Sequence, residues 1–155
     1  KAVEALGANS APIAFGELFT AIAAGVVDGA ENNVPTIHQS KHFEVSKYIC
    51  MDGHSAPSDV LLISTHAWER LSKQKQEWLG KAVAASLERQ IELWDKATAE
   101  AIEAFEKQGI DIVWPNKEPF VQAVQPLYDE LRDAGDPLYD VAMKIRKLEV
   151  EENAD

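Results

Sequence analysis

The sequence is poor in cysteine, in cationic side chains and in long hydrophobic runs, and each shortage excludes a class of protein. Cys50 is the only cysteine, so neither an internal disulfide nor a cysteine-based zinc spacing can form. Lysine and arginine total 15 against 26 aspartates and glutamates, a net charge of −11, which argues against binding to nucleic acid or to anionic lipid. No apolar run approaches the ~20 residues that a membrane-spanning helix needs.

The first residues read as the end of a helix rather than as the start of a domain. The chain opens on Lys1 without a methionine or a leader peptide, and Gly7 is a suitable helix stop. We therefore expect a truncated fragment whose natural protein begins further upstream.

A long helical pattern dominates the second half of the chain. It runs from Ser72, a suitable N-cap, to Gly109, a suitable stop. Apolar residues recur along it every three or four positions, at Leu79, Val83, Leu87, Ile91, Trp94, Ala97, Ala101 and Phe105. Such a helix would be about 50 Å long, too long for one small core, so we expect it to span two lobes or to pack on a partner.

Shorter helices and strands alternate along the rest of the chain. Periodicity and turn residues predict helices over 16–25, 35–44, 118–134 and 138–148, with a kink or break at Pro126, and strands over 45–51, 59–64 and 110–114. The strand over 59–64 is almost entirely apolar, which is typical of a strand buried on both faces of a parallel or mixed sheet. The predicted fold class is α/β.

Two segments near the start carry the most specific pattern. Residues 6–19 read LGANSAPIAFGELF, and residues 25–32 read GVVDGAEN. Further pieces are KHFEVSKY at 41–48, Gly53-His54 and KQG at 107–109. In combination they resemble the solute-binding subunits of tripartite ATP-independent periplasmic (TRAP) transporters, the DctP-type family that includes binders of four-carbon dicarboxylates and of sialic acid. The resemblance covers most of the chain and corresponds to the C-terminal portion of such a protein.

The resemblance implies a fold, a function and partners. The fold is a two-lobed α/β periplasmic binding protein whose lobes close on a small organic acid, a carboxylate. Residues 1–71 would form part of the second lobe with hinge-crossing strands, residues 72–109 a long helix spanning the lobes, and residues 110–155 the C-terminal strand and helices. The closed protein would then deliver its solute to the membrane permease subunits of a TRAP transporter, which an ion gradient drives.

The resemblance also implies three ligand-binding residues. Phe15 matches the family's ligand-facing aromatic, and Asn32 matches an amide that donates to the ligand. Glu31 would accept a hydrogen bond from a substrate hydroxyl or order the site. The arginine that holds the ligand carboxylate in such proteins would lie before Lys1. From the residues alone, Phe15 is equally a core aromatic and Asn32 a turn residue, and both alternatives stay open.

No metal and no other cofactor is expected. His38 and His42 stand four residues apart, but no third ligand has a defined spacing. Family members that hold a keto acid through a metal carry Trp after the acidic residue, where this chain has Asn32. His54 follows Gly53 at the end of a predicted strand, and a role for it in the cleft or hinge is a hypothesis.

Two other classes of function are weighed against a binding protein. An enzyme is not expected, because the sequence contains neither a nucleophile motif nor a glycine-rich phosphate loop. The second alternative is a helical interaction fragment that binds no ligand of its own. Its long apolar stripe would pair between chains, and the fragment would then dimerise or swap elements.

Overall fold

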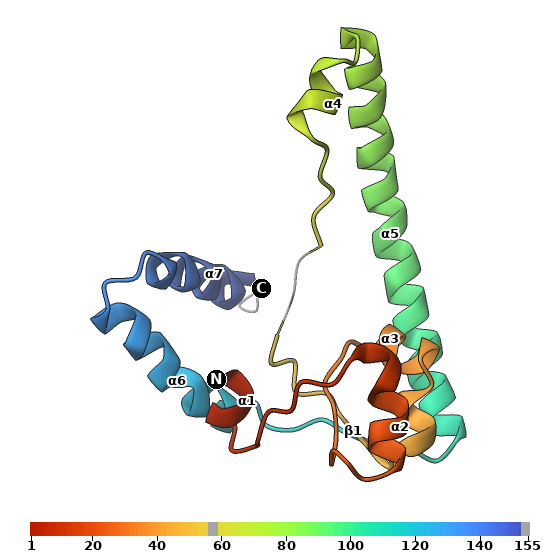
Figure 1. Ribbon diagram of the computed structural model, residues 1–155, viewed down its shortest axis with the longest axis vertical. Helices are drawn as coiled ribbons and strands as arrows, with labels where there is room; N and C mark the ends of the chain where they lie inside the picture. Colours follow the sequence, from red (N-terminus) through yellow and green to blue (C-terminus); the bar gives the residue numbers. More distant parts are fainter. Residues whose placement is uncertain (56–58, 153–155) are drawn as a thin grey trace. The chain divides into compact units, whose positions relative to one another are not determined.

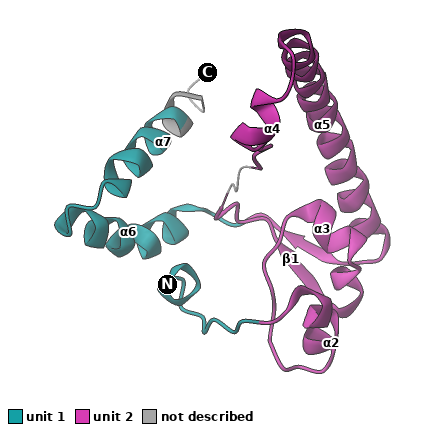
Figure 2. Cartoon of the chain, turned by 45° about the horizontal axis from the view of Figure 1, so that its top comes forward, with its two compact units in different colours: residues 1–12, 115–155 teal, residues 13–114 magenta. Residues whose placement is uncertain are grey.

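The computed structural model describes residues 1–55 and 59–152, and the chain divides into two compact units. Unit 1 joins residues 1–12 to residues 115–155, and unit 2 comprises residues 13–114 (Figure 2). Among the described helices, none combines the length and the apolar character needed to cross a bilayer.

The longest element of unit 2 is helix α5, Lys73–Lys107 (Figure 1). Ser72 begins it as predicted, because its hydroxyl oxygen accepts a hydrogen bond from the backbone N–H of Lys75 at 3.4 Å. Gly109 follows its C-cap with a φ of +72°, a left-handed conformation that glycine adopts without steric cost. The 35 residues of α5 correspond to a rod about 50 Å long, which confirms the predicted long helix.

The core of unit 2 lies against the C-terminal end of α5. Ala101 and Phe105 are both 0% exposed and pack with Phe43 and Ile49. The rings of Phe43 and Phe105 are 5.2 Å apart between centroids. Two short helices, α2 (Leu18–Ala23) and α3 (Val34–Gln39), gather at this end in Figure 1, and α3 packs directly on α5.

The sheet of unit 2 consists of two parallel strands, β1 (Tyr48–Cys50) and β2 (Asp111–Val113). Ile49 pairs with Ile112 in the middle of the register. Both strands fall within the ranges predicted from the sequence. Because the strands are parallel, their carboxyl ends lie at the same edge, and that edge is where ligands bind in many α/β proteins.

The predicted helix over 35–44 is wrong, because the structure has two separate pieces there. Helix α3 ends at Gln39, and the 3-10 helix η2 (His42–Val45) follows it. Lys41, between them, has a φ of 59°. A residue in this left-handed conformation cannot continue a right-handed helix, so the chain changes direction at that point.

The predicted buried strand over 59–64 is also wrong. These described residues form neither strand nor helix, and Val60, Leu61, Leu62 and Ile63 are all exposed. A strand requires a pairing partner, and within the described residues β1 and β2 pair only with each other. The chain then enters α4 (Thr65–Glu69), where Ser64 caps the helix by accepting from the backbone N–H of Ala67 at 3.2 Å.

Unit 1 contains α1 (Ala2–Ala5), α6 (Glu118–Asp133) and α7 (Leu138–Glu152). The ammonium of Lys1 lies 2.8 Å from a carboxylate oxygen of Glu130 on α6. Arg146 of α7 lies over the ring of Tyr128 on α6, 5.4 Å from its centroid. Helix α6 runs through Pro126 without a break, so the predicted helices of this unit are confirmed and a break at Pro126 is not.

Candidate functional site

A pocket of about 230 Å³ lies in unit 2 beside β1 and the segment that follows it. Its polar lining includes Glu31, Asn32, Asp52 and His54, and its apolar lining includes Ile22, Ile37 and Ile49. A few polar groups on an otherwise apolar wall are typical of a small-molecule site. The volume falls below the ~300–1,000 Å³ of complete ligand sites, as expected if this unit supplies only part of one.

The two-residue periodicity of β1 positions one wall of the pocket. Ile49 is buried among the core residues, whereas Tyr48 and Cys50 are exposed and line the pocket. Asp52 continues the same spacing just beyond the strand and also lines the pocket. Alternate residues of an extended chain point to the same side, so Tyr48 and Cys50 share the exposed face of β1, and the buried Ile49 also reaches the pocket lining.

A turn at Gly53 brings Asp52 and His54 together. Gly53 has a φ of +60°, and one oxygen of Asp52, Oδ1, accepts from the backbone N–H of His54 at 3.3 Å and lies 2.9 Å from its Nδ1. Burial alone would raise the pKa of the Asp52 carboxyl, but the hydrogen bonds from the side chain and backbone of His54, with its charge, outweigh burial and lower that pKa. Asp52 is therefore an ionised acceptor at neutral pH.

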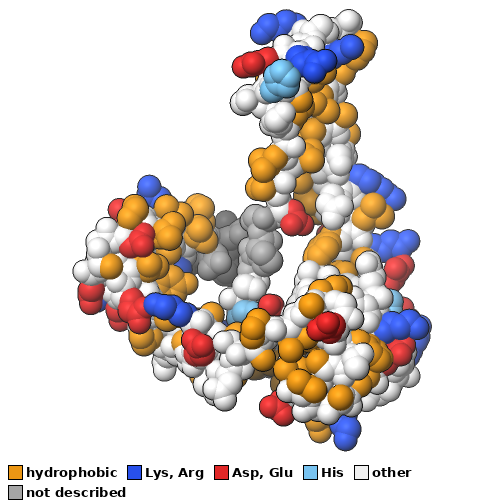
Figure 3. All heavy atoms as spheres, in the orientation of Figure 1, with side chains coloured by type: hydrophobic (Ala, Val, Ile, Leu, Met, Phe, Trp, Pro, Cys, Tyr) orange, Lys and Arg blue, Asp and Glu red, His pale blue; other side chains and the backbone are white. Residues whose placement is uncertain are grey.

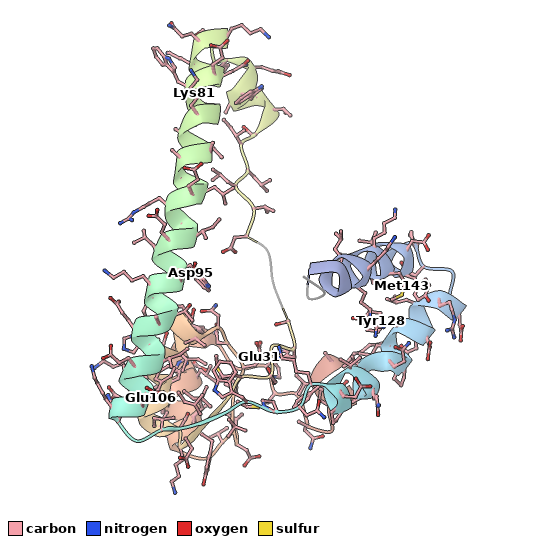
Figure 4. All side chains as sticks on the ribbon, turned by 180° about the vertical axis from the view of Figure 1, so that it is seen from behind. Glu31, Lys81, Asp95, Glu106, Tyr128 and Met143 are labelled. Atoms are coloured by element: carbon pink, nitrogen blue, oxygen red, sulfur yellow. The ribbon has the colours of Figure 1, made fainter. Side chains whose placement is uncertain are left out.

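Glu31 faces the same histidine from another segment. Its Oε2 lies 3.7 Å from Nε2 of His54, and its side chain is 65% exposed. Figure 4 shows Glu31 at the end of unit 2 that contains Glu106, the C-terminal end of α5. A separation of 3.7 Å is longer than a good hydrogen bond, so both atoms remain available to a ligand.

The two neighbouring asparagines have different roles. Asn33 caps α3, its side-chain oxygen accepting from the backbone N–H of Thr36 at 2.9 Å. The side-chain oxygen of Asn32 accepts from the backbone N–H of Asn33, also at 2.9 Å. This bond leaves the NH2 group of Asn32 as the unused donor, since no described residue accepts from it. An amide donor on the pocket wall suits a carboxylate or hydroxyl oxygen.

Phe15 lies next to the pocket lining without being part of it. It begins the 3-10 helix η1 (Phe15–Glu17), and its side chain is 54% exposed. Its ring contacts that of His42 edge to face, with centroids 5.5 Å apart. His42 is buried and lines the pocket. Of the three residues predicted to bind ligand, the structure thus brings Glu31 and Asn32 into one pocket and places Phe15 against His42, a residue of its lining.

Cys50 and His38 are two further reactive side chains of unit 2. Partial desolvation and the charge of Asp52 raise the pKa of the exposed Cys50 thiol, which disfavours the reactive thiolate. His38 stacks on Phe43, 5.6 Å between centroids, and contacts the edge of Phe105, so it belongs to the core. Within residues 1–55 and 59–152, no three His, Cys, Asp or Glu side chains lie close enough together to hold a metal ion.

Asp52 and Tyr48 are pocket residues that lie outside the set predicted from the sequence. The Asp52-Gly53 dipeptide by itself indicates only a turn, which the structure does contain. The signal that identifies it is the spacing of Tyr48, Cys50 and Asp52 along one face of an extended segment. That signal becomes usable once the buried face of β1 is known.

Comparison with known proteins places the chain in a family. The model of DctP, the bacterial extracellular solute-binding protein family 7, matches residues 1–134. The sialic acid-binding periplasmic protein SiaP of Vibrio cholerae serotype O1 is 34% identical over 133 residues, which cover 85% of this chain and 41% of SiaP.

Solved structures show the same relationship. A TRAP periplasmic solute-binding protein of Xanthobacter autotrophicus Py2 with bound β-D-galacturonate superposes with a TM-score of 0.79 at 36% identity, covering 90% of this chain and 46% of that one. A second, of Bradyrhizobium sp. BTAi1 in complex with α/β-D-galacturonate, gives a TM-score of 0.77 at 37% identity, covering 92% and 47%.

The match therefore extends over almost all of this chain but over less than half the length of these relatives. The family and these relatives are solute-binding proteins, not enzymes, which agrees with the absence of a nucleophile motif from the sequence. The α/β fold expected from the sequence is that of the TRAP binding proteins. The chain belongs to family 7 of the bacterial extracellular solute-binding proteins, the DctP family.

Proposed function

We propose that this chain is part of a two-lobed periplasmic protein that captures a small organic acid and delivers it to a TRAP permease. The observation that carries the proposal is the pocket in unit 2, where the free amide donor of Asn32 lies beside Glu31 and the Asp52–His54 pair. Family membership supports the role in binding. The relatives named above, two called periplasmic solute-binding proteins of TRAP systems, support the compartment and the permease partner.

The chemistry of the pocket favours a sugar acid over a simple dicarboxylate. Glu31 and Asp52 both present negative oxygens, and no Lys or Arg occurs among the described residues that line the pocket. A second ligand carboxylate placed here would be repelled, whereas sugar hydroxyls can donate to these oxygens. The named ligands of the relatives, sialic acid and galacturonate, are both hydroxylated acids.

The rest of the site is proposed to come from outside this chain. An arginine upstream of Lys1 would hold the ligand carboxylate with two parallel hydrogen bonds, and Phe15 would form an apolar wall once the lobes close. In this arrangement residues 1–71 belong to the second lobe and its hinge, residues 72–109 span both lobes, and residues 110–155 complete the C-terminal strand and helices. Ligand would stabilise the closed state because it binds that state more tightly than the open one.

Calorimetry on the full-length protein tests the proposal. The panel is D-galacturonate, D-glucuronate, N-acetylneuraminate and succinate, and we expect binding of at least one sugar acid and weak or no binding of succinate. If none of the four acids gives a heat of binding, the proposed function is overturned. A preference for succinate would overturn the proposed substrate class.

One observation favours a second candidate, a fragment that associates through its helices. Large apolar side chains of α5 are exposed, including Trp78, Leu87 and Ile91. Such a surface can pair two copies of the chain. Light scattering on the isolated chain decides this point: a concentration-dependent dimer supports association, and a monomer at high concentration contradicts it.

A further inference from the structure

Asp52 is more enclosed than Glu31, the other carboxylate that contacts His54. Its side chain is 23% exposed, against 65% for Glu31. A single oxygen, Oδ1, contacts both the backbone N–H and Nδ1 of His54. The short loop through Gly53 therefore holds His54 at two points, its backbone N–H and one ring nitrogen.

When the ring carries a single proton, this contact determines which nitrogen holds it. A carboxylate can only accept hydrogen bonds, so the 2.9 Å contact requires a proton on Nδ1. In a neutral imidazole the other nitrogen, Nε2, is then an acceptor. Nε2 is the atom that lies 3.7 Å from Oε2 of Glu31.

The opposite tautomer would close this part of the pocket. With the proton on Nε2, the ring could donate to Glu31 after a shift of a few tenths of an ångström, and the two groups would satisfy each other. With the proton on Nδ1, Nε2 and Oε2 are two adjacent acceptors. Adjacent acceptors match two neighbouring hydroxyl groups, each of which donates one proton, and they do not match a carboxylate, which has none.

We propose that Asp52 is a positioning residue that keeps the single proton of an uncharged His54 ring on Nδ1, and that Nε2 and Glu31 then form a paired acceptor for two neighbouring hydroxyls of a sugar acid. The inference rests on the proposed function for the identity of the ligand. The role of Asp52 toward the histidine ring rests on the geometry of this chain alone.

Nitrogen-15 NMR of the histidine rings in the ligand-free full-length protein tests the positioning role directly. At a pH where the ring is neutral, the wild type is expected to show His54 protonated on Nδ1. Asp52→Ala is expected to shift the proton to Nε2. Asp52→Asn retains a side-chain oxygen that can accept from Nδ1, so it is expected to preserve the wild-type tautomer. Retention of the Nδ1–H form in Asp52→Ala would overturn the inference.

Ligand affinity tests the consequence. Asp52→Ala is expected to weaken binding of D-galacturonate roughly tenfold, about the effect of one hydrogen bond to a charged group, and Asp52→Asn to restore most of it. Asp95→Ala, which removes an exposed carboxylate midway along α5 (Figure 4), is the matched control and should bind as the wild type does. Monodeoxy-galacturonates provide the sharper test. The analogue that lacks one of the two hydroxyls proposed to contact Nε2 and Glu31 should bind wild type and Asp52→Ala with equal affinity.

The outcomes separate this inference from the proposed function. If the wild type binds none of the sugar acids, the function fails, and the NMR result still decides the role of Asp52. If the wild type binds galacturonate and Asp52→Ala binds it equally well while remaining folded, the function stands and the paired acceptor is wrong. If Asp52→Ala does not fold, a loss of the Nδ1–H form or of affinity in Asp52→Asn would count against the hydrogen-bond role.

Discussion

The two ends of α5 follow one sequence pattern and have opposite environments. At the C-terminal end Ala101 and Phe105 are completely buried under α3 and the sheet, whereas toward the N-terminus Leu87 is 62% exposed on the same apolar stripe. Figure 3 shows hydrophobic side chains along the length of this helix that the rest of unit 2 leaves uncovered. The spacing of apolar residues therefore predicts which face of a helix requires cover, and the covering surface has to come from elsewhere.

The chain spans 46% and 47% of the two solved structures described above. We propose that the remaining part of the full-length protein covers the exposed stripe of α5, and the following variants test the difference between the two ends.

The largest effect is expected at the buried end. Phe105→Ala removes a fully buried ring that packs on Phe43 in the core and should lower the free energy of unfolding by about 3–5 kcal/mol. Urea denaturation followed by circular dichroism measures this change. A loss below about 1 kcal/mol would mean that the core described here does not stabilise the protein.

Leu87→Ala should distinguish the full-length protein from the isolated chain. In the full-length protein, where we propose that Leu87 is covered, the variant should lower the free energy of unfolding by about 2 kcal/mol or more. In the isolated chain the exposed side chain should contribute less than about 0.5 kcal/mol. Equal effects in both proteins would contradict the proposed cover over this end of α5.

Variants of the two neighbouring asparagines should separate an effect on ligand binding from an effect on stability. Asn32→Ala should weaken the binding of a sugar acid by about 1–3 kcal/mol, because it removes the free amide donor. Asn33→Ala should instead lower the stability of the protein by about 1 kcal/mol through loss of the cap of α3. Calorimetry and thermal melting on both variants test this assignment, which is wrong if the two effects are exchanged.

The smallest effect is expected from Asp52 as the pH changes. Its pKa is lowered in the folded protein, so its ionised form stabilises the fold above the unfolded-state pKa of about 3.9. This contribution is lost as the pH falls through the lower folded-state pKa. The melting temperature of wild type should therefore exceed that of Asp52→Asn at pH 6, and the difference should shrink toward pH 3. A difference that does not change with pH would show that the charge of Asp52 does not act on stability.

The elements that the sequence predicted well are those whose signals are local. The caps at Ser72 and Gly109 and the stripe between them are sufficient to define α5, whatever covers it. The strand over 59–64 failed for the opposite reason, because an apolar run becomes a strand only when another strand pairs with it. The split at Lys41 was missed because lysine carries no preference for the left-handed conformation that it adopts there.

The site was predictable to a similar degree. Glu31 and Asn32 follow from the resemblance and do line the pocket, but Asp52 depends on the face of β1 that is buried and on the turn at Gly53. Phe15 contacts the pocket residue His42 without lining the pocket itself, so its contact with ligand stays a prediction.

The exposed run from Val60 to Ile63 has a practical consequence for handling the protein. These four consecutive aliphatic residues include two that are β-branched, Val60 and Ile63, and contain no charge and no proline. The charged residue next to this run is Asp59, on its N-terminal side. The isolated chain should therefore aggregate through residues 60–63 as the protein concentration rises, and Leu62→Lys should reduce this aggregation.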